Sequence, residues 1–171
     1  AVEGELIGAN LVGALKGRGY EAPRQIVLLN DTVATLLAGK ATSADSDFDS
    51  YVGFILGTGT NSAYVESNSN IGKLGSPARD GRQIINIESG NLNRIAGGSI
   101  DSVFDATTKR PGSYRFEKMV SGAYLGPLCG AVLHEAVDAG LFSGEAGKAL
   151  SSIDDFDTIA VDNFLHSPGN S

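Results

Sequence analysis

The sequence has only one cysteine, Cys129, and no apolar run near the ~20 residues that a membrane-spanning helix needs. A single cysteine excludes a disulfide within the chain and fits a reducing compartment, so we expect a cytoplasmic protein. Basic residues are also scarce, because 13 Lys and Arg stand against 20 Asp and Glu, giving a net charge of −7. We therefore expect neither nucleic acid nor a membrane surface as a partner, since both attract clusters of Lys and Arg.

Internal repeats, heptad patterns and low-complexity tracts are absent as well. The apolar fraction of 42% over 171 residues is enough for one modest domain, or for one whole and one partial lobe. The first residue is Ala rather than Met, so we expect the chain to be part of a longer protein.

Apolar periodicity predicts an α/β protein. Helical spacing is present over residues 6–17, 32–38, 101–106, 115–141 and 158–165, and Pro127 is expected to kink or restart the longest of these helices. Strands are predicted over residues 25–29, 51–56, 62–66 and 84–88, with the second and third forming a hairpin. Polar loops are predicted at 42–50 and 67–82.

Polar residues follow several of the predicted strands, where α/β proteins gather their ligand-binding groups. Asn30 and Asp31 close one strand, Gly57-Thr58-Gly59-Thr60-Asn61 joins two others, Glu88 ends a fourth, and Glu117 opens the long helix. Carboxylates and amides of this kind, beside a Gly-Thr turn, suit a polyhydroxylated substrate next to a phosphate. The pattern predicts a sugar kinase, or part of one.

Asp31 is the candidate general base. A carboxylate just past a buried strand can be held within hydrogen-bond reach of a substrate hydroxyl, and phosphoryl transfer to an alcohol needs a proton acceptor there. Asp31 and Asn30 are equally good caps for the helix that follows, so a purely structural role stays open.

The Gly57–Asn61 turn is a candidate phosphate loop. Glycines let the backbone approach an anion, and the hydroxyls of Thr58 and Thr60 add donors. The turn is not a Walker loop, because no Gly-Lys-Ser/Thr follows it. It is not a dinucleotide fingerprint either, because the sixth position is Ser62 and the next segment alternates like a strand. A plain hairpin turn remains possible.

Glu88 and Glu117 are candidates for binding a sugar, because carboxylates accept hydrogen bonds from sugar hydroxyls. For Glu117 the alternative is a favourable negative charge near a helix start. The remaining singletons, His134 and His166, have no ligand-type spacing, and we assign no metal ligand in this chain.

Four segments together resemble the hexokinase family. They are LLNDTVATLLAG (28–39), VGFILGTGTNSAYVE (52–66), IINIESGN (84–91) and PGSYRFEKMVSGAYLG (111–126), and their order over about 100 residues is more specific than any one motif. The ESGN segment is similar to the microbial branch of the family.

The resemblance implies a role for each candidate residue. Asp31 would take the proton from the C6 hydroxyl of a hexose, with glucose expected. Asn30, Asn61, Glu88 and Glu117 would bind the sugar hydroxyls. Gly57, Thr58, Gly59 and Thr60 would contact the phosphates of ATP, and Mg²⁺ would be carried by ATP.

The resemblance also implies a ribonuclease H-like, actin-like ATPase fold with a mixed sheet and packed helices, present here in part. Residues 1–48 would be the end of the small lobe with the hinge, and 49–171 the beginning of the large lobe. Family members carry an Asp-x-Gly-Gly-Thr loop, a Ser/Thr-Lys segment and a Gly-rich adenosine loop, and none of these occurs here. We therefore expect the 171 residues alone to be inactive.

Two other functions stay open on the same fold. A non-catalytic sugar sensor would keep Asn61, Glu88 and Glu117 without transferring phosphate. An actin-like ATPase scaffold would bind ATP with no requirement for a sugar. Neither the preferred hexose nor the oligomeric state follows from the sequence.

Overall fold

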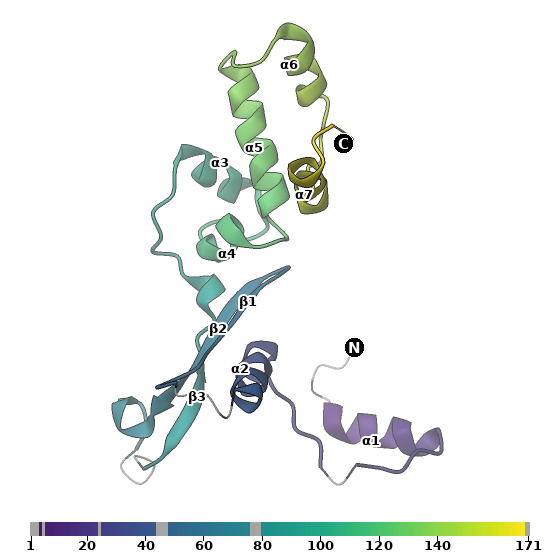
Figure 1. Cartoon of the computed structure of the whole chain (residues 1–171), viewed down its shortest axis with the longest axis vertical. Coiled ribbons are helices and arrows are strands. Elements are labelled where there is room, and N and C mark those ends of the chain that lie inside the picture. The colour runs from purple at the N-terminus through teal and green to yellow at the C-terminus, as the bar shows by residue number, and fades with distance from the viewer. Residues whose placement is uncertain (1–3, 5, 24, 44–47, 76–79, 170–171) are drawn as a thin grey trace.

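A computed structural model describes residues 4, 6–23, 25–43, 48–75 and 80–169. Its sheet consists of β1 (Val52–Leu56), β2 (Thr60–Ser67) and β3 (Arg82–Asn86), side by side in that order (Figure 1). Both pairs are antiparallel, with Ala63 opposite Gly53 on one side and Asn86 on the other. The predicted hairpin and the strand before Glu88 are confirmed. A mixed sheet was expected, but no parallel pair occurs among the described residues, because both connections between the strands reverse the chain.

Helix α2 (Asp31–Thr42) packs against the hairpin and confirms the helix predicted after Asn30. Its Thr32 and Leu36 are fully buried. A Cβ at Gly53 of β1 would lie 2.5 Å from the carbonyl oxygen of Thr32 and 2.8 Å from Leu36 Cβ. Only glycine allows this approach, so Gly53 fixes the start of α2 against β1.

The strand predicted at residues 25–29 is wrong. This segment has no regular structure, and Val27, Leu28 and Leu29 are each more than half exposed. A strand exists only by pairing with another, and none of the described strands pairs with this apolar run. Ile26 instead lies beside Gly8 of α1 (Ile7–Gly17), the first helix, which ends at the predicted glycine.

Helices make up the other half of the molecule, above the sheet in Figure 1. Two short 3₁₀ helices, η1 (Asn68–Asn70) and η3 (Ser89–Asn91), precede them. The helices are α3 (Ser99–Thr107), α4 (Arg115–Val120), α5 (Leu125–Asp138), α6 (Gly144–Ser151) and α7 (Thr158–His166). No helix in the described part of the chain has the length and apolarity to cross a membrane.

The long helix predicted over residues 115–141 is two helices, α4 and α5, separated at Ser121–Tyr124. Pro127 is the third residue of α5, within the first turn, where a backbone N–H has no acceptor inside the helix. The predicted restart near Pro127 is therefore confirmed.

The segment that leads into α7 crosses the start of α5 at two glycines. A Cβ at Gly126 would overlap the carbonyl carbon of Asp157, and one at Gly130 would lie 2.8 Å from the Phe156 ring. The hydroxyl of Thr158 donates to the carbonyl of Gly122 at 2.6 Å and accepts from the N–H of Gly126 at 2.8 Å. The connection between α4 and α5 is thus fixed from the side of α7.

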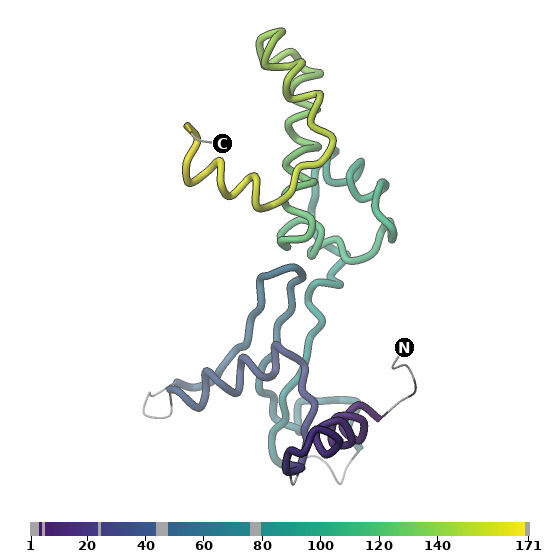
Figure 2. The backbone as a smooth tube through the Cα atoms, turned by 90° about the vertical axis from the view of Figure 1, so that its right-hand side faces the viewer, coloured from purple at the N-terminus to yellow at the C-terminus, as the bar shows by residue number. Residues whose placement is uncertain are grey.

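The described residues include only parts of the two predicted loops, because residues 44–47 and 76–79 lie outside them. The tip of the β1–β2 hairpin reaches the helical half, as the view turned by 90° shows (Figure 2). This meeting of hairpin and helices brings most of the candidate residues together.

Candidate functional site

Glu117 reaches the first residue of β2 from the first turn of α4. Its Oε2 accepts a hydrogen bond from the backbone N–H of Thr60 at 3.0 Å, across 57 positions in the sequence. The alternative role of Glu117, a favourable negative charge near a helix start, would not require this contact. The second oxygen, Oε1, makes no hydrogen bond with the described residues, so it is available to a substrate.

Two glycines make room for the Glu117 carboxylate. A Cβ at Gly59 would lie 2.7 Å from its Oε2, and one at Gly90 would lie 3.0 Å from the same atom and 2.7 Å from the carbonyl oxygen of Thr60. Side chains at positions 59 and 90 would therefore displace the carboxylate or the start of β2.

Glu88 and Asn61 belong to one hydrogen-bonded chain of side chains. Asn61 Nδ2 donates to Asn86 Oδ1 at 2.8 Å, and Asn86 Nδ2 donates to Glu88 Oε1 at 2.6 Å. Asn61 Nδ2 also lies 3.5 Å from Glu88 Oε1. Since Thr60 and Asn61 are neighbours on β2, the same short segment holds both Glu117 and Glu88.

The backbone of Glu88 has a left-handed conformation, with φ 55° and ψ 47°. Residues other than glycine, Asn and Asp seldom adopt this region, and such positions gather at functional sites. Here it turns the chain from β3 into η3, which places Gly90 beside Glu117. The unusual backbone thus serves to bring two carboxylate-bearing segments to the start of β2.

The 57–59 turn is held by the connection between α4 and α5. The N–H of Gly122 donates to the carbonyl of Gly57 at 2.7 Å, and that of Ala123 donates to the carbonyl of Thr58 at 3.1 Å. The Thr58 side chain is exposed and makes no hydrogen bond with the described residues. Thr60 differs, because its hydroxyl donates inward to the carbonyl of Ile55 at 2.9 Å. Thr58 therefore has a free hydroxyl donor for a phosphate, and Thr60 has none.

Asn30 and Asp31 begin α2, and both take part in its capping. The backbone N–H of Thr32 donates to Asn30 Oδ1 at 2.9 Å and to Asp31 Oδ1 at 2.8 Å. Asp31 is exposed, and its Oδ2 makes no hydrogen bond with the described residues. No hydrogen bond in this part of the chain joins Asp31 to Asn61, Glu88 or Glu117. The cap and the chemical role are compatible, because they use different oxygens.

Glu88 and Glu117 make no ion pair with a described residue. The Lys or Arg ion pair in this part of the chain is Lys118–Asp105. Free carboxylate oxygens suit hydroxyl groups, which donate hydrogen bonds. The described residues contain no group of three His, Cys, Asp or Glu side chains that could hold a metal ion.

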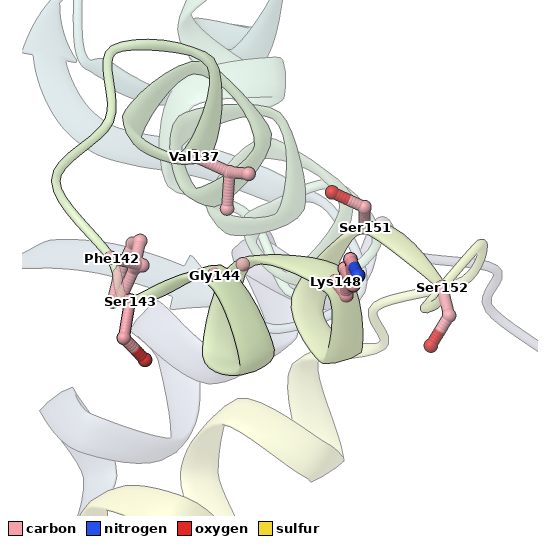
Figure 3. Close-up of a pocket in the computed structure, with 8 residues that line it drawn as sticks. Val137, Phe142, Ser143, Gly144, Lys148, Ser151 and Ser152 are labelled. Atoms are coloured by element: carbon pink, nitrogen blue, oxygen red, sulfur yellow. The ribbon is translucent and has the colours of Figure 1, made fainter.

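A pocket of about 430 Å³ lies elsewhere, between the end of α5 and α6 (Figure 3). Val137, Phe142 and Lys148 are among its lining residues, and none of the candidate residues is. The candidate site is therefore a meeting of chain segments rather than this pocket.

The motif-based prediction missed Asn86 and Gly90. Asn86 stands two positions before Glu88, and in the strand predicted over residues 84–88 this spacing would place the two side chains on one face. That signal was present in the sequence. The role of Gly90 depends on a helix 27 residues further along, so no local pattern could reveal it.

Comparisons with known proteins identify the family of the chain. The family model described as Hexokinase matches residues 51–169. The chain belongs to the hexokinase family. Hexokinase-1 of Nicotiana tabacum is 39% identical over 156 residues, covering 86% of this chain and 30% of the relative. Hexokinase-1 of Schizosaccharomyces pombe is 34% identical over 151 residues, covering 84% of this chain and 30% of the relative.

A solved structure of hexokinase from Schistosoma mansoni, complexed with glucose, matches 99% of this chain and 38% of its own, with a TM-score of 0.69 and 29% identity. The likeness confirms the predicted hexokinase fold, of the actin-like ATPase type, present in part. The chain spans about 30% of the length of the curated relatives above. A microbial origin within the hexokinases stays a prediction.

Proposed function

We propose that the protein containing this chain is an ATP-dependent hexokinase, which transfers the γ-phosphoryl group of ATP to the 6-hydroxyl of a hexose, with glucose the expected substrate. The reaction would be the first step of glycolysis. The observation that carries the proposal is the convergence of Glu117, Asn61 and Glu88 on the start of β2, directly beyond a glycine-rich turn.

Each residue then has a role that its contacts support. Glu117 and Glu88 accept hydrogen bonds from sugar hydroxyls through their free oxygens. Asn61, together with the amide nitrogen of Asn30, donates to the sugar. Asp31 takes the proton of the attacking hydroxyl, through the oxygen that does not cap α2.

The 57–59 turn faces the phosphates of ATP, which arrives with its Mg²⁺. Gly57 and Gly59 let the backbone approach an anion, and Thr58 adds a free hydroxyl. Thr60 supports the turn from within, because its hydroxyl and its N–H are both bonded to other residues. The protein's part in this step is positioning and charge stabilisation.

Residues 1–48 form the end of the small lobe and the hinge, and residues 49–171 the beginning of the large lobe. The start of the family match at residue 51 supports this boundary. We place the protein in the cytoplasm, which its single cysteine supports.

Coupled measurement of ADP formation tests the proposal in the full-length protein. We expect ADP release that requires both ATP and glucose. Binding of glucose without ADP release would instead identify a sugar sensor. ADP release that is indifferent to sugar would identify an ATPase of the actin-like type, and either result would overturn the proposal.

A further inference from the structure

Asn86, at the end of β3, lies between two residues to which the proposed function assigns the sugar. Its side chain accepts from Asn61 Nδ2 at 2.8 Å and donates to Glu88 Oε1 at 2.6 Å. Both distances are those of well-formed hydrogen bonds, and the second is charge-assisted.

The direction of this hydrogen-bonded chain is determined by the backbone. Asn61 Oδ1 accepts from the N–H of Ser62 at 2.7 Å and from the N–H of Ser89 at 3.2 Å. A backbone N–H can only donate, so the amide nitrogen of Asn61 must face Asn86. The oxygen of Asn86 then faces Asn61, and its nitrogen faces the ionised carboxylate of Glu88, which can only accept.

This arrangement leaves Glu88 with one oxygen held and one free. Oε1 accepts from Asn86, and Oε2 makes no hydrogen bond with the described residues. Glu88 is exposed, so without Asn86 only the long 3.5 Å contact with Asn61 Nδ2 would hold its side chain. Holding the carboxylate in advance removes part of the ordering cost that substrate binding would otherwise carry.

We propose that Asn86 is a positioning residue for hexose binding, which orients Glu88 through its amide nitrogen and couples it to Asn61. This inference rests on the proposed function. Asn86 itself need not touch the sugar, because its oxygen and one of its N–H groups are occupied by Asn61 and Glu88.

The test measures glucose KM, glucose Kd and kcat in the full-length protein and in two variants. Asn86→Ala removes both hydrogen bonds. Asn86→Asp keeps an acceptor for Asn61, but it removes the donor to Glu88 and places a second carboxylate beside it. We expect each variant to raise KM and Kd on the order of tenfold, as the loss of a hydrogen bond to a charged group does, with kcat changed much less.

Asn70→Ala is a matched control. Asn70 Nδ2 donates to Glu66 Oε1 at 2.8 Å, which is the same kind of amide–carboxylate bond. Glu66 lies five residues from Asn61 along β2, or about 17 Å. The glucose KM of the Asn70→Ala variant should match that of the unsubstituted protein.

A double-mutant cycle with Glu88→Ala separates positioning from a general structural role, because alanine leaves Asn86 no side-chain acceptor at position 88. If Asn86 acts through Glu88, Asn86→Ala should have little further effect on KM once Glu88 is Ala. This inference would be overturned if Asn86→Ala raised KM equally with and without the substitution at position 88, or if neither Asn86 variant changed KM. In both cases glucose turnover by the unsubstituted protein would still support the proposed function. If the unsubstituted protein neither binds nor phosphorylates glucose, the proposed function is wrong and this inference falls with it.

Discussion

Lys118 Nζ lies 2.5 Å from Oδ1 of Asp105, and the lysine side chain is only 4% exposed. The same nitrogen donates to the carbonyl of Arg110 at 2.7 Å, and Asp105 Oδ2 accepts from the N–H of Gly112 at 2.7 Å. The pair therefore joins α3, the 108–114 loop and α4. Since Lys118 follows Glu117 directly, the ion pair helps to fix the helix that carries a proposed sugar ligand.

Lys118→Met should destabilise the full-length protein by about 3 kcal/mol. Removing one partner of a buried pair leaves the other charge without compensation. The midpoint of urea unfolding measures the loss. Lys40→Met, at an exposed lysine of α2, is the control and should change the midpoint little. Equal midpoints for the two variants would show that the ion pair contributes nothing.

The same ion pair predicts a dependence of stability on pH. The hydrogen bond from Lys118, followed by that from Gly112, lowers the pKa of Asp105 from its ordinary value of 3.8. A lowered pKa in the folded state gives stability that is complete above the ordinary value and is lost as pH falls through the folded one. Asp105→Asn should therefore weaken the fall in stability below about pH 4. Urea midpoints of the Asp105→Asn variant and of the unsubstituted protein, measured from neutral pH down to the acid limit of folding, would test this prediction. Midpoints that fall in parallel with pH would contradict it.

Asp31→Ala should reduce kcat by about 10²–10⁴-fold in the full-length protein, which is the usual contribution of a general base. Sugar binding should fall much less, because Asn61, Glu88 and Glu117 remain. Steady-state kinetics and direct glucose binding separate the two quantities. Unchanged turnover would refute the assignment of the base and leave Asp31 as part of the helix cap.

Gly59→Ala should raise the glucose KM on the order of tenfold, since the added Cβ would lie 2.7 Å from Glu117 Oε2 and displace the carboxylate. Gly39→Ala is the matched control, because a Cβ there has nothing within 4 Å. It should leave KM unchanged. If Gly59→Ala behaves like the control, Glu117 does not hold the sugar from this position.

The 171 residues alone should show no ATP- and glucose-dependent ADP release. Phosphoryl transfer needs charge stabilisation from both sides of the phosphates, and the sequence contains only one of the family's phosphate loops. Coupled ADP assay of the isolated chain, beside the full-length protein, measures the difference. Robust turnover by the isolated chain would show that its own residues are sufficient.

Much of the fold was predictable because local patterns determine it. An apolar run before the Gly57–Thr60 turn and an alternating segment after it predict the hairpin, and Asn30 marks the start of α2. The segment 25–29 failed because its apolar residues identify a buried strand only if a partner strand lies beside it. Helix α6 was missed because its apolar residues are few, although Ser143 caps it by accepting from the N–H of Ala146 at 3.4 Å.

The candidate site divides in the same way. Glu88 and the Gly57–Asn61 turn stand at strand ends, where sequence alone selects them. The contact between Glu117 and Thr60 could not be predicted from spacing, because η1, β3, η3 and α3 lie between them in the sequence. Whether Glu117 reaches Thr60 depends on tertiary packing, including the glycines at positions 59 and 90.

The separation of Thr60 and Glu117 along the chain has a consequence for the order in which the protein matures. During synthesis the hairpin is complete long before residue 117 leaves the ribosome, and closing so long a loop carries an entropic cost. An immature chain can thus possess its turn and its first carboxylate while lacking the second. Under the proposed function, hexose binding would require that α4 has already docked on the hairpin.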